Sequence, residues 1–226
     1  MALKLFGRTG VTSPKRETRD GEDIPIRVLR DGTLSVVQFA QIMSLEGRVF
    51  IANFGTEGTP VALQTAYDAD RPSLNVDVPD GIVAVPLYFE IQVAATGAVQ
   101  FDGKLMVSPV IVGLGTSAAA YTAITTLNAN LGSTNTSGCQ ARHTFTANGA
   151  TPEGSARWLS HFSSAADIDA AGSNPSHFEW NASKGLFIPV VADGGSINAY
   201  FYNGTSATAY AVLAWAELTN SDIKNL

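Results

Sequence analysis

The apolar residues of this chain fall in short runs that turn residues interrupt, and the clearest run is IVAVPLYFEIQV at 82–93. Successive side chains of a β-strand point to opposite faces of a sheet, so an alternating apolar set indicates a strand with one buried face. In this run the alternating apolar set consists of Val83, Val85, Leu87, Phe89 and Ile91. The opposite face then holds Ala84, Pro86, Tyr88, Glu90 and Gln92. Because Pro86 lacks a backbone N–H, we expect an edge strand or a bulge at this point.

Comparable runs predict strands along most of the chain, separated by Asp-Gly, Asn-Gly, Asn-Pro and Gly-Ser turns. Their ranges are 24–29, 48–54, 103–113, 140–147, 156–162, 177–182, 185–191, 196–203 and 208–218. The segment 103–113 follows the Asp102-Gly103 turn, so we expect it to pair with 82–93 as a hairpin. Segments 76–89 and 189–202 share one pattern, in which apolar residues lead through Asp-Gly into a long strand. This echo indicates two strands in equivalent positions of a sandwich.

Two segments favour helix to different degrees. In 116–132 the apolar residues Tyr121, Ile124, Leu127 and Leu131 recur at steps of three, three and four, which predicts a short amphipathic helix that ends near Gly132. In 33–47 the residues Val36, Phe39, Ala40 and Met43 fit a helical stripe. The β-branched and aromatic residues in the first half of 33–47 favour a strand instead, and we predict a strand there.

Many short strands with one or two helical insertions predict an all-β sandwich or barrel. Regularly spaced helices of 10–15 residues are missing from the pattern, which excludes the Rossmann and TIM-barrel architectures. Residues 7–23 combine Gly, Pro and charge with almost no apolar content. We therefore predict a flexible N-terminal arm over 1–23 and a single β-sandwich domain over 24–226.

The charge is low and uneven. Only 15% of the residues are charged, compared with about 25% in an ordinary soluble domain. A low-charge surface suits a protein that packs against copies of itself, although ordinary β-sandwiches also show it. The net charge of −6 argues against broad nucleic-acid binding by the body.

The arm, by contrast, is basic, through Lys4, Arg8, Lys15, Arg16 and Arg19. Residues 1–30 carry seven basic and four acidic groups, a net charge of +3, whereas the rest carries −9. A basic arm suits contact with nucleic acid, lipid headgroups or an acidic neighbouring subunit, and the plain alternative is a solvated terminus.

Residues that carry chemistry are sparse. The single Cys139 excludes an intrachain disulfide and a cysteine-based zinc site, and its spacing from His143 puts the two side chains about 13 Å apart along a strand. The histidines His143, His161 and His177 lack the spacing of a known metal motif. There is neither a G-x-S-x-G elbow nor a complete phosphate loop. We predict no catalytic residue, no metal and no cofactor, and hence no enzyme.

The first residues lack the apolar core of a secretory signal, and no segment is apolar enough for a membrane span. We therefore expect synthesis in the cytoplasm. Aromatic residues beside Asn, at Trp180-Asn181 and Tyr202-Asn203, are typical of sugar-binding sandwich surfaces. Aromatic residues at alternating strand positions also commonly fill a core, and both interpretations stay open.

Taken together, the basic arm, the short strands, the inserted segment 116–132 and the Thr/Ala/Gly/Asn-rich body resemble viral structural proteins of the single jelly-roll kind. The closing segment FIPVVADGGSINAYFYNGTSATAYAVLAWAELT (187–219) is similar to phage head and decoration proteins in its Pro-then-Gly-Gly entry and its terminal Trp-Ala-Glu strand. The resemblance covers most of the chain but contains no diagnostic motif. The weakly basic arm and acidic body depart from genome-packaging capsid proteins, which puts direct genome binding in doubt.

The resemblance implies a jelly-roll β-sandwich that acts as a capsid subunit in a virion. Its partners would be copies of itself and other virion proteins, with only weak contact between the arm and nucleic acid. The alternative is a carbohydrate- or receptor-binding module such as a fibre head or lectin. For the subunit interface or glycan surface we select Tyr88, Trp180, Asn181, Tyr202 and Asn203.

Overall fold

The computed structural model describes residues 39–95, 101–113, 121–146, 150–163, 177–184, 189–203 and 207–223. The chain divides into two compact units, 1–42 and 43–226, and every β-strand of the described residues belongs to the second unit. The predicted arm, its boundary at residue 23 and the predicted strand at 24–29 lie outside the described residues.

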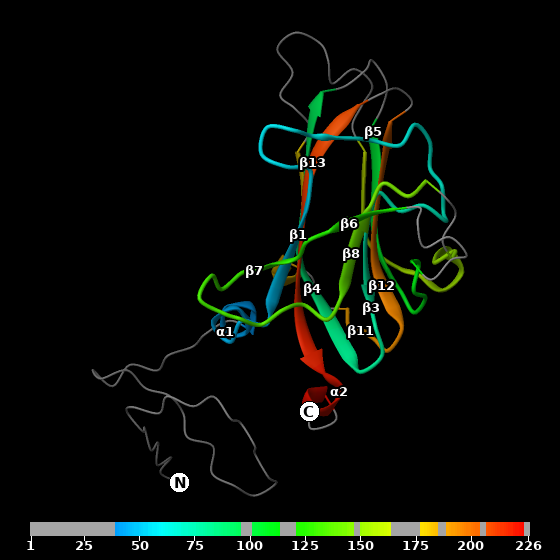
Figure 1. Ribbon diagram of the computed structural model, residues 1–226. Helices are drawn as coiled ribbons and strands as arrows, with labels where there is room; N and C mark the ends of the chain where they lie inside the picture. The colour runs from blue at the N-terminus through cyan, green and yellow to red at the C-terminus, as the bar shows by residue number, and fades with distance from the viewer. Residues whose placement is uncertain are drawn as a thin grey trace, which may run out of the picture. The chain divides into compact units, whose positions relative to one another are not determined.

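The strands form two sheets, which stand face to face in Figure 1. The first, here the β4–β13 sheet, has the order β10 (His177–Asn181), β4 (Ile82–Ala95), β13 (Thr208–Thr219), β1 (Val49–Phe54) and β7 (Leu127–Asn128). Two short strands add to it: β11 (Val191–Ala192) pairs with β4, and β2 (Val61–Ala62) pairs with β13. The second, here the β5–β12 sheet, has the order β6 (Thr122–Ile124), β8 (Gln140–His143), β3 (Leu74–Val78), β12 (Gly195–Asn203), β5 (Phe101–Ser108) and β9 (Arg157–Ser163). The helical elements are α1 (Phe39–Leu45), η1 (Glu153–Ser155), η2 (Ala182–Lys184) and α2 (Asn220–Ile223).

The strand order is that of a jelly roll. Four main strands, β1-β13-β4-β10, lie in one sheet, and β3-β12-β5-β9 lie in the other. Along the chain, β1, β3, β4 and β5 lie in alternate sheets, and so do β9, β10, β12 and β13. All pairings between neighbouring strands of these sheets are antiparallel. Two Greek keys folded onto each other in this way make a jelly roll, which confirms the predicted fold class.

The core fills the space between the two sheets. Its largest fully buried side chains include Phe89, Phe101, Phe201 and Trp215. The rings of Phe101 and Phe178 stack at 5.5 Å between centroids, and Phe54 meets Phe201 edge-on at 4.9 Å. Aromatic pairs at these separations add to the stabilisation that burial alone provides.

Strand β4 has the predicted bulge but not the predicted edge position. It lies between β13 on one side and β10 and β11 on the other. Pro86 sits between the segment that pairs with β11, which ends at Ala84, and the segment that pairs with β10, which begins at Tyr88. The register with β13 shifts at Pro86, because Trp215 is opposite Pro86 while Ala214 is opposite Tyr88. The ring without an N–H is thus accommodated by a bulge at Leu87 inside the sheet.

The same bulge corrects the predicted buried face of β4. Phe89 and Ile91 pack in the core between the sheets, as predicted, and Ala84 also packs there. Val85 and Leu87 instead pack on the outer face, in a small cluster with Met43. One extra residue in the strand reverses the alternation, so a single apolar stripe in the sequence serves two faces.

The predicted hairpin between 82–93 and 103–113 is wrong. Strand β5 crosses to the opposite sheet, where it pairs with β12 and β9 along almost its whole length. Sequence-adjacent strands of a jelly roll commonly lie in different sheets, so a turn signal between two strands does not ensure that they pair.

The predicted helix over 116–132 is wrong for its described part, residues 121–132. Those residues form β6 and β7, and the remainder of the range lies outside the described residues. Ile124 pairs with Ala141 and packs on the core, whereas Leu131 is fully exposed in a turn. The spacing of the apolar residues was therefore not the sign of one buried helical face, and strand pairing determined the local structure.

The predicted strand over 33–47 is also wrong where it is described. Phe39–Leu45 is a helix, as the alternative interpretation had it, and residues 33–38 lie outside the described residues. Gly47 adopts a φ of +67°, and its N–H donates to the carbonyl of Ser44 at 3.0 Å. The N–H of Arg48 donates to the carbonyl of Met43 at 2.9 Å. Glycine after the last turn is the common way to satisfy these terminal carbonyls, and this cap outweighed the β-branched composition.

The echo between 76–89 and 189–202 has a structural basis. In each segment the chain passes from one sheet to the other through its turn, from β3 to β4 and from β11 to β12. The two turns bond to each other: the Gly81 N–H donates to Asp193 Oδ1 at 3.0 Å, and the Gly194 N–H donates to the carbonyl of Val78 at 3.1 Å. The two turns therefore lie side by side at one end of the sandwich, and the long strands that follow them, β4 and β12, lie in opposite sheets.

Candidate functional site

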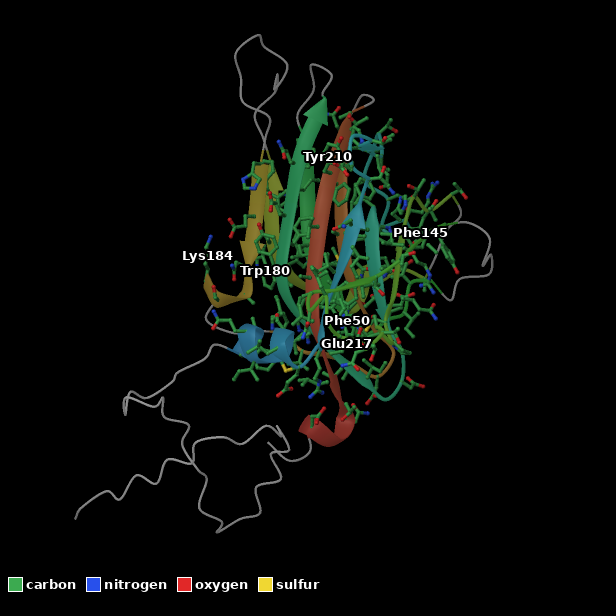
Figure 2. The ribbon with its side chains drawn as sticks, turned by 60° about the vertical axis from the view of Figure 1, so that its left-hand side comes forward. Phe50, Phe145, Trp180, Lys184, Tyr210 and Glu217 are labelled. Carbon is green, nitrogen blue, oxygen red and sulfur yellow. The ribbon has the colours of Figure 1, made fainter. Side chains whose placement is uncertain are left out.

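The five residues selected for a binding or interface surface do not form one site. Tyr88 and Asn181 are opposite each other on the outer face of the β4–β13 sheet. Trp180, which Figure 2 labels on β10, is partly buried against the core on the other side of that strand. Tyr202 belongs to the β5–β12 sheet, and Asn203 beside it is fully buried. Asn203 is thus excluded from an exposed surface, because its position in β12 turns it inward.

Tyr88 and Asn181 border a hydrogen-bonded cluster on the outer face of β4 and β10. The Tyr88 hydroxyl donates to Glu90 Oε2 at 2.5 Å, and His177 Nε2 lies 2.9 Å from Glu90 Oε1. Lys184, which Figure 2 shows at the edge of this sheet, pairs with Glu179 at 3.0 Å. These side chains form hydrogen bonds or ion pairs with one another and remain in contact with water. We therefore interpret the cluster as a solvated polar face of the sheet.

The electrostatics of the cluster follow from these contacts. Burial, the hydrogen bond to Glu90 and the charge of Glu90 together raise the pKa of Tyr88 to about 12. The hydrogen bond from Tyr88, followed by that from His177, holds the pKa of Glu90 below its ordinary value of 4.5, against a smaller opposing effect of burial. Glu90 is therefore ionised and Tyr88 protonated at neutral pH, which leaves neither of them poised as a general acid or base.

A second surface lies where the insertion between β5 and β9 passes β1. Asparagine side chains fix this part of the chain to the segment that follows α1. Asn128 donates to the carbonyl of Gly47 at 2.8 Å, Asn130 to that of Leu45 at 3.1 Å, and Asn135 to that of Gly47 at 3.2 Å. Side-chain amides that bond to a neighbouring backbone give the turn a defined conformation without burying it.

Three leucines on the segments that these hydrogen bonds join are exposed to solvent. Leu131 is 99% exposed, Leu45 is 75% exposed and Leu127 is 50% exposed. A scattered exposed leucine is normal, but these three lie on segments that the asparagine hydrogen bonds join, and apolar side chains exposed together in this way suit contact with another molecule. We call Leu45, Leu127 and Leu131 the leucine surface. Sequence reasoning missed it because Leu127 and Leu131 were assigned to the buried stripe of a helix.

The Trp-Ala-Glu motif of the resemblance proves to be structural. Trp215 is fully buried and its indole N–H donates to Glu217 Oε1 at 2.9 Å. Glu217 also accepts the N–H of Gly138 at 2.9 Å and the hydroxyl of Ser137. Figure 2 shows Glu217 low on the sandwich, near Phe50. The motif therefore fixes the turn that leads from β7 to β8, and with it the base of the insertion.

Cys139 is not arranged as a nucleophile. Burial, and then the negative charge of Glu217, raise the pKa of its thiol far above the ordinary range. A reactive cysteine needs the opposite environment, one that stabilises the thiolate. His143 lies at the end of β8, where its Nδ1 is 2.7 Å from the hydroxyl of Thr144, and burial lowers its pKa.

A buried polar network lies on the outer face of the β5–β12 sheet, beneath residues 109–113. The carboxylate of Asp77 forms an ion pair with Arg142 and accepts the N–H groups of Val112 at 3.1 Å and Gly113 at 2.9 Å. Asn75 donates to Asp77 Oδ1 at 3.0 Å and to Asn198. Asn75 Oδ1 is buried and finds no hydrogen-bond partner among the described residues. The other contacts named here lie inside the protein, and through Asp77 they hold residues 112–113 on the sheet.

Within the described residues, no group of histidine, cysteine, aspartate and glutamate side chains is placed to hold a metal ion. In the same part of the chain, no helix has the length and apolarity needed to cross a membrane. The arm residues Lys4, Arg8, Lys15, Arg16 and Arg19 lie outside it. No family model, curated protein or solved structure matches the chain. The fold and its surfaces are therefore the basis for a function.

Proposed function

We propose that this protein is a structural subunit of a virion, which assembles with copies of itself into a capsid shell. The observation that carries the proposal is the jelly-roll topology, with β1-β13-β4-β10 facing β3-β12-β5-β9. Viral capsid subunits are one of the main classes of protein built on this fold, and lectins are another. A fold alone does not fix a function, so the surfaces of the molecule have to support one class over the other.

The strands at the edges of the two sheets support assembly of subunits through their side-chain surfaces and not through strand pairing. The insertion between β5 and β9 places β7 along β1 in one sheet, and β6 and β8 along β3 in the other. The edge strands on this side are therefore β7 and β6, of two and three residues, and such short edges limit unspecific pairing with other chains and favour contacts through defined side-chain surfaces. In a closed shell each such contact can be weak, because many act together.

The leucine surface supplies a contact of the required kind. Its three leucines are exposed in the single subunit, and asparagine side chains join the segments that carry them by hydrogen bonds. The chain as a whole carries only 15% charged residues, so burial of its surface against neighbours costs little desolvation of charge. The occupant that we propose for the leucine surface is a second copy of this chain.

The test is the size distribution of the purified full-length chain, measured by sedimentation velocity and electron microscopy. Shell-sized particles are expected. A discrete trimer that binds a glycan column would favour the alternative, a fibre-head or lectin-like module, and a monomer at all concentrations would contradict assembly.

The basic arm provides a further prediction. Because residues 7–23 are polar and lack periodicity, deletion of residues 1–20 is expected to shift the melting temperature by no more than a few degrees. Loss of the arm's contacts with neighbouring subunits, or of weak contacts with nucleic acid, is expected to lower the yield of particles. Melting and particle yield are measured side by side on the truncated and full-length chains. A truncated chain that fails to fold, or that assembles as well as the full chain, would refute this role for the arm.

A further inference from the structure

A third cluster lies on the outer face of the β5–β12 sheet, away from the leucine surface. Lys104 of β5 is opposite Tyr200 of β12 and His161 of β9. Its ammonium nitrogen lies 3.9 Å from the ring centroid of Tyr67 and 4.7 Å from that of Trp158. A cation between two aromatic rings at these distances is attracted to both, so the charge is held in a fixed position.

The surrounding side chains keep the cluster rigid. The ring of Tyr67 packs against Tyr200 at 5.3 Å and against Tyr202 at 5.8 Å. Tyr200 is fully buried, and its hydroxyl donates to the carbonyl of Ala69 at 2.8 Å. Because Tyr67 is anchored in this way, the side of the cluster that it forms does not have to be ordered when a ligand binds.

The ammonium group of Lys104 has N–H donors that are not used in hydrogen bonds to the described part of the chain. An ammonium group carries three N–H donors, and within the described residues the side chain of Lys104 forms neither an ion pair nor a hydrogen bond. The rings satisfy its charge but none of its N–H groups. A carboxylate placed at the open side of Lys104 would gain a charge-assisted hydrogen bond while the cation keeps its aromatic contacts.

Trp158 supplies an apolar platform next to that charge. Its side chain is 48% exposed, and the exposed ring of His161 meets it edge-on at 6.1 Å between centroids. A large aromatic ring that remains half in water on a rigid sheet is suited to pack against the C–H face of a sugar ring. His161 adds a ring nitrogen at the rim of this platform.

Asp102 limits the type of ligand. It lies two residues before Lys104 on the same face of β5, so the two Cα atoms are about 7 Å apart, comparable to the width of one sugar ring. A carboxylate has acceptor sites for more than one donor, so Asp102 favours a ligand that brings hydroxyl groups. A simple anion offers none and is repelled by this charge.

We propose that Lys104, Trp158 and Asp102 form a binding site for a sugar that carries a carboxylate. Lys104 binds the carboxylate, Trp158 packs against the ring and Asp102 accepts its hydroxyl groups. The site contains none of the residues selected from the sequence, of which only Tyr202 lies beside it, against Tyr67. It does not depend on the proposed assembly, and on a shell it would provide attachment to an acidic glycan.

The test is calorimetric titration of the full chain with three probes, namely glucuronic acid, glucose and acetate. Glucuronic acid is expected to bind about tenfold more tightly than either of the others, because only it offers both charge and hydroxyl groups. Equal affinity for glucuronic acid and acetate would overturn the sugar specificity. Equal affinity for glucuronic acid and glucose would overturn the role of Lys104, and failure of all three to bind would overturn the site.

Variants separate binding from a purely structural role of the cluster. Lys104→Met keeps the aliphatic stem and is expected to remove the preference for glucuronic acid over glucose, whereas Lys104→Arg, which keeps charge and stacking, is expected to retain it. Trp158→Ala is expected to weaken both sugars. Lys184→Met on the other sheet is the matched control and should bind as the unaltered chain does. Each variant is first shown to fold by its melting curve. A folded Lys104→Met variant that keeps the preference, or loss of the preference in Lys184→Met, would contradict the proposal.

Discussion

Phe89 is the residue at which the sequence pattern and the packing agree best. It is fully buried, and its ring stacks near Phe162 at 5.9 Å and Phe201 at 6.4 Å in the core between the sheets. Phe89→Ala removes apolar volume that its neighbours cannot refill. We expect it to lower the free energy of unfolding by about 3–5 kcal/mol, measured by chemical denaturation.

Gln92 is the control for Phe89 on the same strand. Its side chain is exposed on the outer face, so Gln92→Thr should change the free energy of unfolding by no more than about 0.5 kcal/mol. If both substitutions destabilised the protein equally, the two faces of β4 beyond the bulge would be assigned wrongly.

Single ionisable residues also make the free energy of unfolding depend on pH, and Glu90 is the clearest example. The hydrogen bond from Tyr88, and then that from His177, lowers its pKa in the folded protein below 4.5. The charged form is thus favoured by folding, and this stabilisation is complete above pH 4.5 and is lost as the pH falls through the lowered pKa. Glu179, opposite Glu90 on β10, is a second carboxylate on this face.

Glu90→Gln tests this coupling. At neutral pH the variant is expected to be slightly less stable than the unaltered chain, because Glu90 is partly exposed and solvent screens its interactions. Below pH 4.5 the difference in the free energy of unfolding between the two should shrink, as measured by urea denaturation at a series of pH values. A difference that grows on acidification would show that Glu90 is not the group involved.

At the scale of elements, strand β3 illustrates what the sequence pattern conceals. All five residues of LNVDV are buried, the apolar ones in the core and the polar Asn75 and Asp77 in the network beneath residues 109–113. Polar residues that are buried in a network interrupt the apolar pattern by which a strand is identified, so the sequence did not predict β3 as a separate strand. Asp77 is the centre of that network, paired with Arg142 where both side chains are almost completely removed from water.

Removal of the negative charge of Asp77 should therefore destabilise the fold. Asp77→Asn leaves Arg142 buried without its partner, and we expect the free energy of unfolding to fall by about 3–5 kcal/mol. Asp80→Asn, in the exposed turn after β3, is the matched control and should have little effect. The comparison is made by chemical denaturation at neutral pH, and similar values for the two variants would mean that the ion pair does not stabilise the fold.

The other elements could be predicted where local pattern and tertiary structure agree. The strands expected over 48–54, 177–182, 196–203 and 208–218 correspond to β1, β10, β12 and β13. The helix expected at 116–132 failed because β6 and β7 are held by pairing with β8 and β1, which are distant from them in sequence or separated by a loop. The hairpin of β4 and β5 failed for a similar reason, since the jelly roll sends consecutive strands to opposite sheets.

At the scale of the whole molecule, strand number and turn spacing were enough for the fold class but not for the surfaces. Of the residues selected for a surface, Tyr88 and Asn181 are opposite each other on the outer face of one sheet, whereas Trp180 and Asn203 face inward. Which residues meet across a sheet depends on register, and one bulge in β4 changes the face of every residue beyond it. The leucine surface and the Lys104 cluster each combine segments far apart in sequence, and no local pattern indicates them.

Assembly through the leucine surface is the central proposal, and Leu131 offers the most direct access to it. Leu131 is 99% exposed in a turn, so Leu131→Asp should leave the free energy of unfolding unchanged within about 0.5 kcal/mol. It would place a charge in the apolar contact that we propose between subunits. Val190→Asp is the matched control, because Val190 is also exposed but precedes β11 at the opposite side of the β4–β13 sheet.

The decisive measurement is sedimentation velocity of the unaltered chain, Leu131→Asp and Val190→Asp at the same concentrations. We expect large particles for the unaltered chain and for Val190→Asp, and a folded species of the size of one subunit for Leu131→Asp. Particles of unchanged size and yield in Leu131→Asp, or a single-subunit species for the unaltered chain, would contradict assembly through this surface.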